Sequence, residues 1–149
     1  MNQLANILSV ENIILDINVT SKKRVFEQAA LLFENNQGVS RSTVFDSLFS
    51  RERLGSTALG HGVAVPHGRI PNLNKPTAAF MRLANAIPFE APDNINVGIL
   101  VILLVPENAT QEHLEILATL AKILSNSNTR EQLQALTDAE AIYDLFSKQ

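Results

Sequence analysis

The segment from Val97 to Val105 constrains the fold most strongly, because eight of its nine residues are Val, Ile or Leu. A run of this length is far short of the ~20 residues that a membrane-spanning helix needs. Nearly continuous branched apolar residues are typical of a strand that is covered on both faces of its sheet. The segment therefore predicts a central strand with helices packed on each side, and Pro106 is expected to end it.

Shorter patterns place further strands and helices around this central strand. Ser21 and Ser40 are candidate N-caps of two helices, and Gly38 and Gly55 are expected to end them, Gly55 in the left-handed conformation. The predicted strands are 13–17, 63–65 and 77–83, and the predicted helices are 22–35, a second from Ser40 to Gly55, 110–124, 129–136 and 138–146. Strands interleaved with helices indicate a single α/β domain over residues 1–149, with its sheet sandwiched between helical layers.

Composition limits the chemistry that the chain can support. It has 149 residues, 46% of them apolar, and no cysteine, which excludes disulfides, thiolate metal sites and a cysteine nucleophile. Twelve basic and fifteen acidic residues give a formal charge of −3, so nothing favours nucleic acid or an anionic membrane as a partner. Residues 1–6 lack the basic start and long apolar run of a signal peptide. We therefore expect a cytoplasmic protein, without membrane insertion, that binds proteins or small anions.

His67 stands in a setting that favours a nucleophile over an ordinary surface or core histidine. Pro66 has a fixed φ and biases Val65 towards the extended form, so the backbone that enters His67 is stiffened. Gly68 places no side chain behind the imidazole and can expose its amide to an anion. A hydrogen bond to one ring nitrogen leaves the other as a positioned nucleophile, and a pKa of about 6.5 keeps the ring mostly neutral at cellular pH. Attack on a donor phosphate would give a labile N–P bond that can pass the phosphoryl group onward.

Such a histidine needs donors near the phosphoryl oxygens, because phosphoryl transfer depends mainly on positioning and electrostatics. Arg51 lies at the end of the second predicted helix and suits phosphate, although it can equally be a solvated arginine, a role for which Arg69 is also available. Ser56 and Thr57 can donate from their hydroxyl groups or can simply form a turn. His113 lies in the first turn of the helix after the central strand, where it either lies at the core boundary or supplies a second donor.

The run from Arg51 to Arg69 resembles a known signature. It reads Arg-Glu-Arg-Leu-Gly-Ser-Thr-Ala-Leu-Gly-His-Gly-Val-Ala-Val-Pro-His-Gly-Arg, and Leu103 to Pro106, followed by His113-Leu114, extends the resemblance. The chain is similar to the enzyme IIA domains (EIIA type 2) of the phosphotransferase system, of the mannitol/fructose type. It is most similar to their nitrogen-related (nitrogen regulatory) branch, and the resemblance covers essentially the whole chain.

The resemblance implies the mannitol-type IIA fold, a mixed β-sheet flanked by helices, and a phosphotransferase component that needs no metal and no organic cofactor. It implies that His67 is phosphorylated, that His113 positions the phosphoryl group and that Arg51 contacts its oxygens. The implied donor is an HPr-like phosphocarrier protein, supplied by phosphoenolpyruvate. Members of the nitrogen-related branch act mainly as regulators that bind a transporter or sensor kinase according to their phosphorylation state.

Three other functions stay open. A sugar-specific (fructose/mannitol) IIA component would use the same chemistry at His67 but pass the phosphoryl group to a IIB permease domain. A zinc-dependent hydrolase would use His61, His67 and His113, although the sequence has no His-Glu-x-x-His segment. A pure binding domain would leave His67 unmodified. His61 departs from the small or uncharged polar residue that the family pattern leads us to expect, and it lies either at the pocket rim or in solvent.

Overall fold

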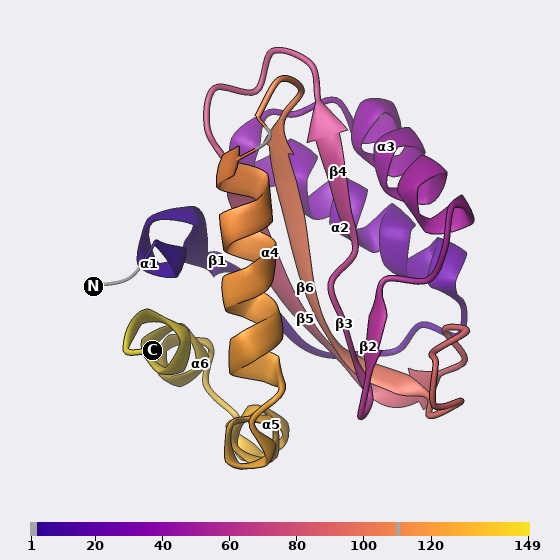
Figure 1. Cartoon of the computed structure of the whole chain (residues 1–149), viewed down its shortest axis with the longest axis vertical. Helices are drawn as coiled ribbons and strands as arrows, with labels where there is room; N and C mark the ends of the chain where they lie inside the picture. Colours follow the sequence, from indigo (N-terminus) through magenta and orange to yellow (C-terminus); the bar gives the residue numbers. More distant parts are fainter. Residues whose placement is uncertain (1–2, 110) are drawn as a thin grey trace.

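The computed structural model describes residues 3–109 and 111–149, and within them the strands form one six-stranded sheet (Figure 1). Thr110, the predicted first residue of the helix after the central strand, lies outside the described residues, as do residues 1 and 2. The strands are β1 (Leu8–Ile17), β2 (Ala58–Gly60), β3 (Val63–Ala64), β4 (His67–Ile70), β5 (Thr77–Ile87) and β6 (Val97–Pro106). The sheet order is β1-β5-β6-β3-β2, and β4 also pairs with β6. Because β5 is antiparallel to β6 while β3 and β4 are parallel to it, the sheet is mixed, as the resemblance implies.

Helices cover both faces of this sheet. They are α1 (Leu4–Ile7), α2 (Lys22–Gln37), α3 (Arg41–Arg53), α4 (Gln111–Leu124), α5 (Ser127–Ala135) and α6 (Ala139–Ser147). Helices α2 and α3 lie on one face, while α4 and the two C-terminal helices lie on the other (Figure 1). This arrangement confirms the predicted α/β sandwich. Within the described residues, no helix combines the length and apolar character that crossing a membrane requires.

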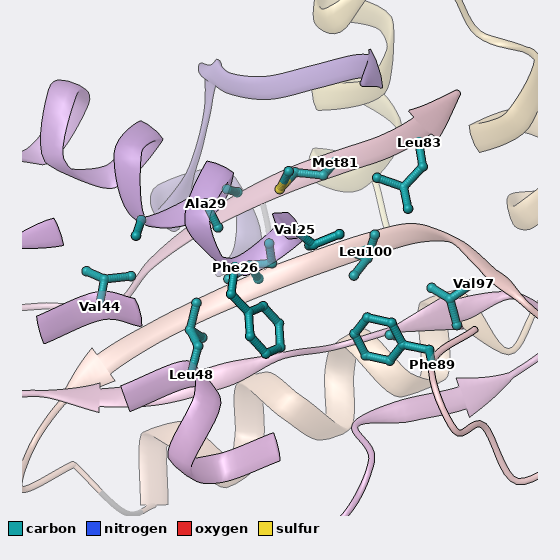
Figure 2. Close-up of a cluster of buried hydrophobic side chains, with 14 of the residues drawn as sticks. Val25, Phe26, Ala29, Val44, Leu48, Met81, Leu83, Phe89, Val97 and Leu100 are labelled. Atoms are coloured by element: carbon teal, nitrogen blue, oxygen red, sulfur yellow. The ribbon is translucent and has the colours of Figure 1, made fainter. Parts of the chain in front are cut away.

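Strand β6 is buried along its whole length and divides the interior into two apolar clusters. Its even-numbered residues from Leu100 to Leu104 pack against α2 and α3, and Figure 2 shows Leu100 in this cluster with Phe26, Leu48 and Phe89. Its odd-numbered residues from Ile99 to Val105 pack against the α4 side. The alternation is the one that a two-residue repeat requires, so the sequence pattern and the two helical layers agree.

The helix ends near Ser40 and Gly55 differ from the prediction. Ser40 does occupy the N-cap position of α3, but its side chain makes no capping hydrogen bond. The helix ends at Arg53, where the N–H groups of Leu54 and Gly55 donate to the carbonyls of Arg51 and Glu52. These tighter bonds satisfy the last carbonyls, so no left-handed glycine is needed, and Gly55 instead has a φ of 153°. Gly38, by contrast, ends α2 with a φ of 69°, as predicted.

Helix α1 and strands β2 and β4 are missing from the sequence prediction, and strands β1 and β5 are longer than predicted. Strands β2 and β4 were not predicted, because a three-residue segment rich in small residues and a four-residue segment with a central glycine carry no apolar repeat. Strand β1 begins at Leu8 instead of residue 13, and its register against β5 is interrupted twice, which hides the alternation. The missed strand β4 is the one that carries His67.

Candidate functional site

Strand β4 turns His67 towards α4. A Cβ atom added at Gly68 would collide with Ser47 of α3, whose Cβ would lie 3.0 Å away. Ile70 packs in the cluster of α2 and α3. Since side chains alternate along a strand, His67 and Arg69 project to the opposite side, where His113 lies. Gly68 is therefore required by the close approach of α3, which is a different reason from the one that the sequence suggested.

Two hydrogen bonds hold the ring of His67 and the backbone that precedes it. Nδ1 of His67 lies 2.8 Å from the carbonyl oxygen of Val65, and the carbonyl of Pro66 accepts from the N–H of Leu103 on β6 at 2.9 Å. A carbonyl can only accept, so Nδ1 carries the ring proton when His67 is neutral. The lone pair is then on Nε2, which makes Nε2 the nucleophilic nitrogen of the ring.

His113 faces His67 from the first turn of α4. The two ring centroids are 5.0 Å apart, with an interplanar angle of 70°. His113 is only 8% exposed, and its Nε2 is buried without a hydrogen-bond partner among the described residues. A buried polar atom in this state is uncommon and costs free energy, so it is typical of a site that awaits a ligand.

Both imidazoles are kept neutral by their surroundings. Burial lowers the pKa of His67 below its usual value, against the opposing effect of the Val65 carbonyl, and the charges of Arg51 and Arg69 lower it further. Burial lowers the pKa of His113 to about 4, with additional contributions from His67 and the same two arginines. Neutral rings at physiological pH provide a lone pair on one histidine and a single N–H donor on the other.

Two arginines, Arg51 and Arg69, supply positive charge near the two histidines. Arg51 donates from Nη1 to the carbonyl of Gly55 at 2.8 Å, which holds its guanidinium beside the loop after α3. Arg69 donates from Nη1 to the carbonyls of Glu107 and Ala109 at 3.0 and 2.8 Å. Arg69 thus fixes the segment that leads into α4, and its charge acts on both histidines, so it is more than the solvated arginine that the sequence suggested.

The predicted hydroxyl donors are engaged within the protein. The hydroxyl of Ser56 donates to the carbonyl of Phe89 at 2.7 Å, and that of Thr57 donates to Oε1 of Glu52 at 2.7 Å. Either hydroxyl would have to leave its partner to donate to a phosphoryl oxygen. A role of Ser56, Thr57 and the Gly68 amide in binding phosphate therefore stays a prediction.

Glu52, beside the loop after α3, was not among the residues predicted from the sequence. Its side chain is only 3% exposed and accepts hydrogen bonds from the loop at Thr57. The available signal was its position, because Val44, Leu48 and Glu52 are the buried residues of α3 and follow one another at intervals of four. A charged residue that continues a buried helical stripe indicates a partnered, structurally engaged carboxylate.

His61 does not join the other two histidines. It lies exposed in the turn between β2 and β3, with a φ of 57°, and its N–H donates to Oδ2 of Asp93 at 2.7 Å. No group of three or more histidine, aspartate or glutamate side chains in the described part of the chain is arranged to hold a metal ion. The arrangement that a zinc hydrolase built on His61, His67 and His113 requires is therefore not formed.

Comparison with known proteins gives a consistent family. Residues 6–149 match the family model described as the phosphoenolpyruvate-dependent sugar phosphotransferase system, EIIA 2. A nitrogen regulatory protein of Pseudomonas aeruginosa is 38% identical over 146 residues, which cover 97% of this chain and 95% of that protein. The crystal structure of nitrogen regulatory protein IIA-Ntr from Neisseria meningitidis has a TM-score of 0.93 at 46% identity, with 97% of this chain and 99% of that chain covered.

The crystal structure of IIA mannitol from Escherichia coli has the same fold, with a TM-score of 0.77 at 23% identity and coverage of 93% of this chain and 97% of that chain. These similarities confirm the predicted fold and resemblance. The chain therefore belongs to the EIIA type-2 family of the phosphotransferase system, in its nitrogen-related branch.

Proposed function

We propose that this IIA component accepts a phosphoryl group on Nε2 of His67 from an HPr-like phosphocarrier, and that its phosphorylation state regulates a transporter or a sensor kinase. The observation that carries the proposal is the pairing of two different histidines. His67 is held through Nδ1, and the buried Nε2 of His113 has no partner among the described residues. The first is an oriented nucleophile, and the second is a donor that a phosphoryl oxygen would satisfy.

The transfer needs no proton to move at His67. The Nε2 lone pair attacks the phosphorus atom of the donor's phosphohistidine, and the new N–P bond forms as the donor's N–P bond breaks. The electron pair of the broken bond returns to the donor imidazole, which leaves as a neutral ring. The Nδ1–H of His67 stays on the Val65 carbonyl at 2.8 Å, where it stabilises the positive charge that the phosphorylated ring acquires. No metal or organic cofactor takes part.

The remaining charged groups position the phosphoryl oxygens. The pKa of His113 is about 4, so its ring is uncharged at physiological pH. An uncharged imidazole has a proton on one of its two nitrogens and therefore offers one N–H donor. Arg51 has further guanidinium donors besides the one on the Gly55 carbonyl, and its charge acts on His67, so the proposal assigns these donors to the phosphoryl oxygens. Preorganised donors of this kind are the main contribution of a protein to phosphoryl transfer.

The regulatory part of the proposal rests on a change of charge beside exposed apolar groups. Phosphorylation adds about −1.5 to −2 charges, by analogy with other phosphorylated side chains. Leu54 and Leu114 are 84% and 64% exposed and flank the site in sequence, next to Arg53 and His113. A partner that covers these side chains together with His67 would sense the added charge. The proposal places this exchange in the cytoplasm, with phosphoenolpyruvate as the ultimate phosphoryl source.

The test is the intact mass of the purified protein after incubation with phosphoenolpyruvate, enzyme I and an HPr-like carrier, with His67→Ala as the matched variant. We expect one acid-labile phosphoryl group on the wild type and none on the variant. A parallel incubation with phosphoramidate, a small donor that phosphorylates imidazole directly, separates the two halves of the proposal. Uptake from phosphoramidate alone would overturn the HPr-like donor, whereas equal uptake by the variant would overturn His67.

The same phosphorylated protein separates regulation from sugar transport. Incubation with a fructose-type or mannitol-type IIB domain should leave the phosphoryl group on His67. Rapid transfer to the IIB domain would favour a sugar-specific IIA component instead. No uptake from either donor, with the carrier shown to be phosphorylated, would favour a pure binding domain.

A further inference from the structure

Two consecutive residues at the end of α3 hold the same loop from different sides. Arg51 donates to the carbonyl of Gly55 at 2.8 Å. Glu52 accepts from the N–H of Thr57 at 3.0 Å and from its hydroxyl at 2.7 Å. The loop between Gly55 and Thr57 is therefore clamped at both ends by neighbouring side chains.

The Glu52 carboxylate is buried but fully partnered. In addition to Thr57, it accepts from Nζ of Lys22, the first residue of α2, at 3.0 Å. Lys22 also contacts Glu90 at 3.1 Å and lies 4.5 Å from the centre of the Phe89 ring. Removing one member of such a buried pair is costly, because the other charge loses its partner.

Ser56, the middle residue of this loop, is bonded to the segment at Phe89 that also contacts Lys22. Ser56 donates to the carbonyl of Phe89 at 2.7 Å, so the loop is joined to the segment that holds Lys22. Glu52 thus connects the start of α2, the end of α3 and the loop beside the site. Its charge also acts on the nucleophile itself, because it raises the pKa of His67 against the lowering effect of burial.

We propose that Glu52 is a positioning residue for phosphoryl transfer: by clamping the loop at Thr57, it fixes the Gly55 carbonyl and, through that carbonyl, the Arg51 guanidinium. This assignment rests on the proposed function of His67 and extends it to a residue that does not touch the phosphoryl group. Loss of the clamp lets the loop and Arg51 move together. A misplacement of about 1 Å at a reacting centre can lower a rate roughly a hundredfold.

The test compares single and double variants in transfer from the HPr-like carrier. Glu52→Ala should lower the limiting rate at saturating donor about tenfold to a hundredfold, with little change in the donor concentration at half-maximal rate. Glu52→Gln should restore most of the rate, because the amide oxygen can still accept from the Thr57 N–H while the amide nitrogen donates to a reoriented Thr57 hydroxyl. Glu90→Ala is the matched control, since it removes the exposed partner of the same lysine and should transfer like the wild type.

Two readouts separate positioning from simple stabilisation. In an Arg51→Ala background, the effect of Glu52→Ala should largely vanish, because the two residues act as one unit; additive effects would overturn the assignment. In NMR titrations, Glu52→Gln should lower the pKa of His67 relative to the wild type, and an unchanged pKa would contradict the proximity of the two groups. Should the wild type itself take up no phosphoryl group, the proposed function would fall and this assignment with it. Normal wild-type uptake with additive losses would overturn only the role of Glu52.

Discussion

His61 and His67 lie six residues apart in the chain, yet the structure gives them opposite settings. His61 occupies an exposed turn with a φ of 57°, and its backbone N–H donates to the side-chain carboxylate of Asp93. His67 lies on strand β4, which pairs with β6, and its ring is held at Nδ1 and faces a buried second histidine. The comparison shows that the presence of a histidine contributes less to such a site than its placement does. The backbone sets the direction in which the ring points and determines which ring nitrogen keeps its lone pair.

The largest expected effect is the difference in phosphoryl transfer between a variant that lacks His67 and a variant that lacks His61. His67→Ala should reduce phosphoryl uptake to background, because the variant has no nucleophile to form the N–P bond. His61→Ala should leave the rate within about twofold of the wild type, as exposed substitutions outside a site generally do. Stopped-flow transfer from the phosphorylated carrier measures both. A large loss with His61→Ala would place that turn in the transfer reaction and break the comparison.

The second effect concerns the ring opposite His67. His113→Ala should slow transfer roughly a hundredfold, the usual loss when one preorganised donor to a developing charge is removed. His113→Gln is the matched variant, because its amide N–H can replace the imidazole N–H, and it should retain more of the rate. Thermal unfolding of both variants should show a folded protein with one cooperative transition. Transfer at the wild-type rate by His113→Ala would demote His113 to a packing residue.

The pH dependence of transfer provides a third, smaller effect. In the proposed transfer the nucleophile is the neutral ring of His67. Burial lowers the pKa of this ring, so the neutral form persists to lower pH than in an ordinary histidine with a pKa of about 6.5. The rate constant should therefore begin to fall at a lower pH than an ordinary histidine would give, and fall about tenfold per unit once the pH drops below the pKa of His67. A midpoint above 6.5 would contradict the buried, neutral nucleophile.

The smallest effect on transfer belongs to the turn that carries His61. Gly60 has a φ of 93°, and a Cβ atom placed there would lie 3.1 Å from Oδ2 of Asp93. Gly60→Ala should therefore lower the free energy of unfolding by about 1–3 kcal/mol through backbone strain, while transfer changes little. Denaturant titration together with the transfer assay measures the two quantities. A large drop in rate at wild-type stability would show that the turn and the His67 site are coupled.

Long, regular patterns in the sequence were sufficient to predict the frame of the molecule. The central strand, α2 with its Gly38 end and α4 follow from apolar repeats, and His67 and His113 follow from their settings and from the family signature. Strand β4 could not be predicted, because four residues that include Gly68 show no repeat, and its position depends on pairing with β6. Glu52 was missed for a related reason. Its partners Lys22 and Thr57 become neighbours only when α2, α3 and the loop pack together.

The central claim is that the phosphoryl group is on Nε2 of His67 while Nδ1 remains bonded to the Val65 carbonyl. The most direct test is NMR of the phosphorylated protein with 15N-labelled histidine, which assigns each ring nitrogen and detects its coupling to 31P. The account predicts a 31P coupling to Nε2 of His67 and a retained proton on Nδ1. A coupling to Nδ1 of His67, or to a nitrogen of His61 or His113, would contradict it.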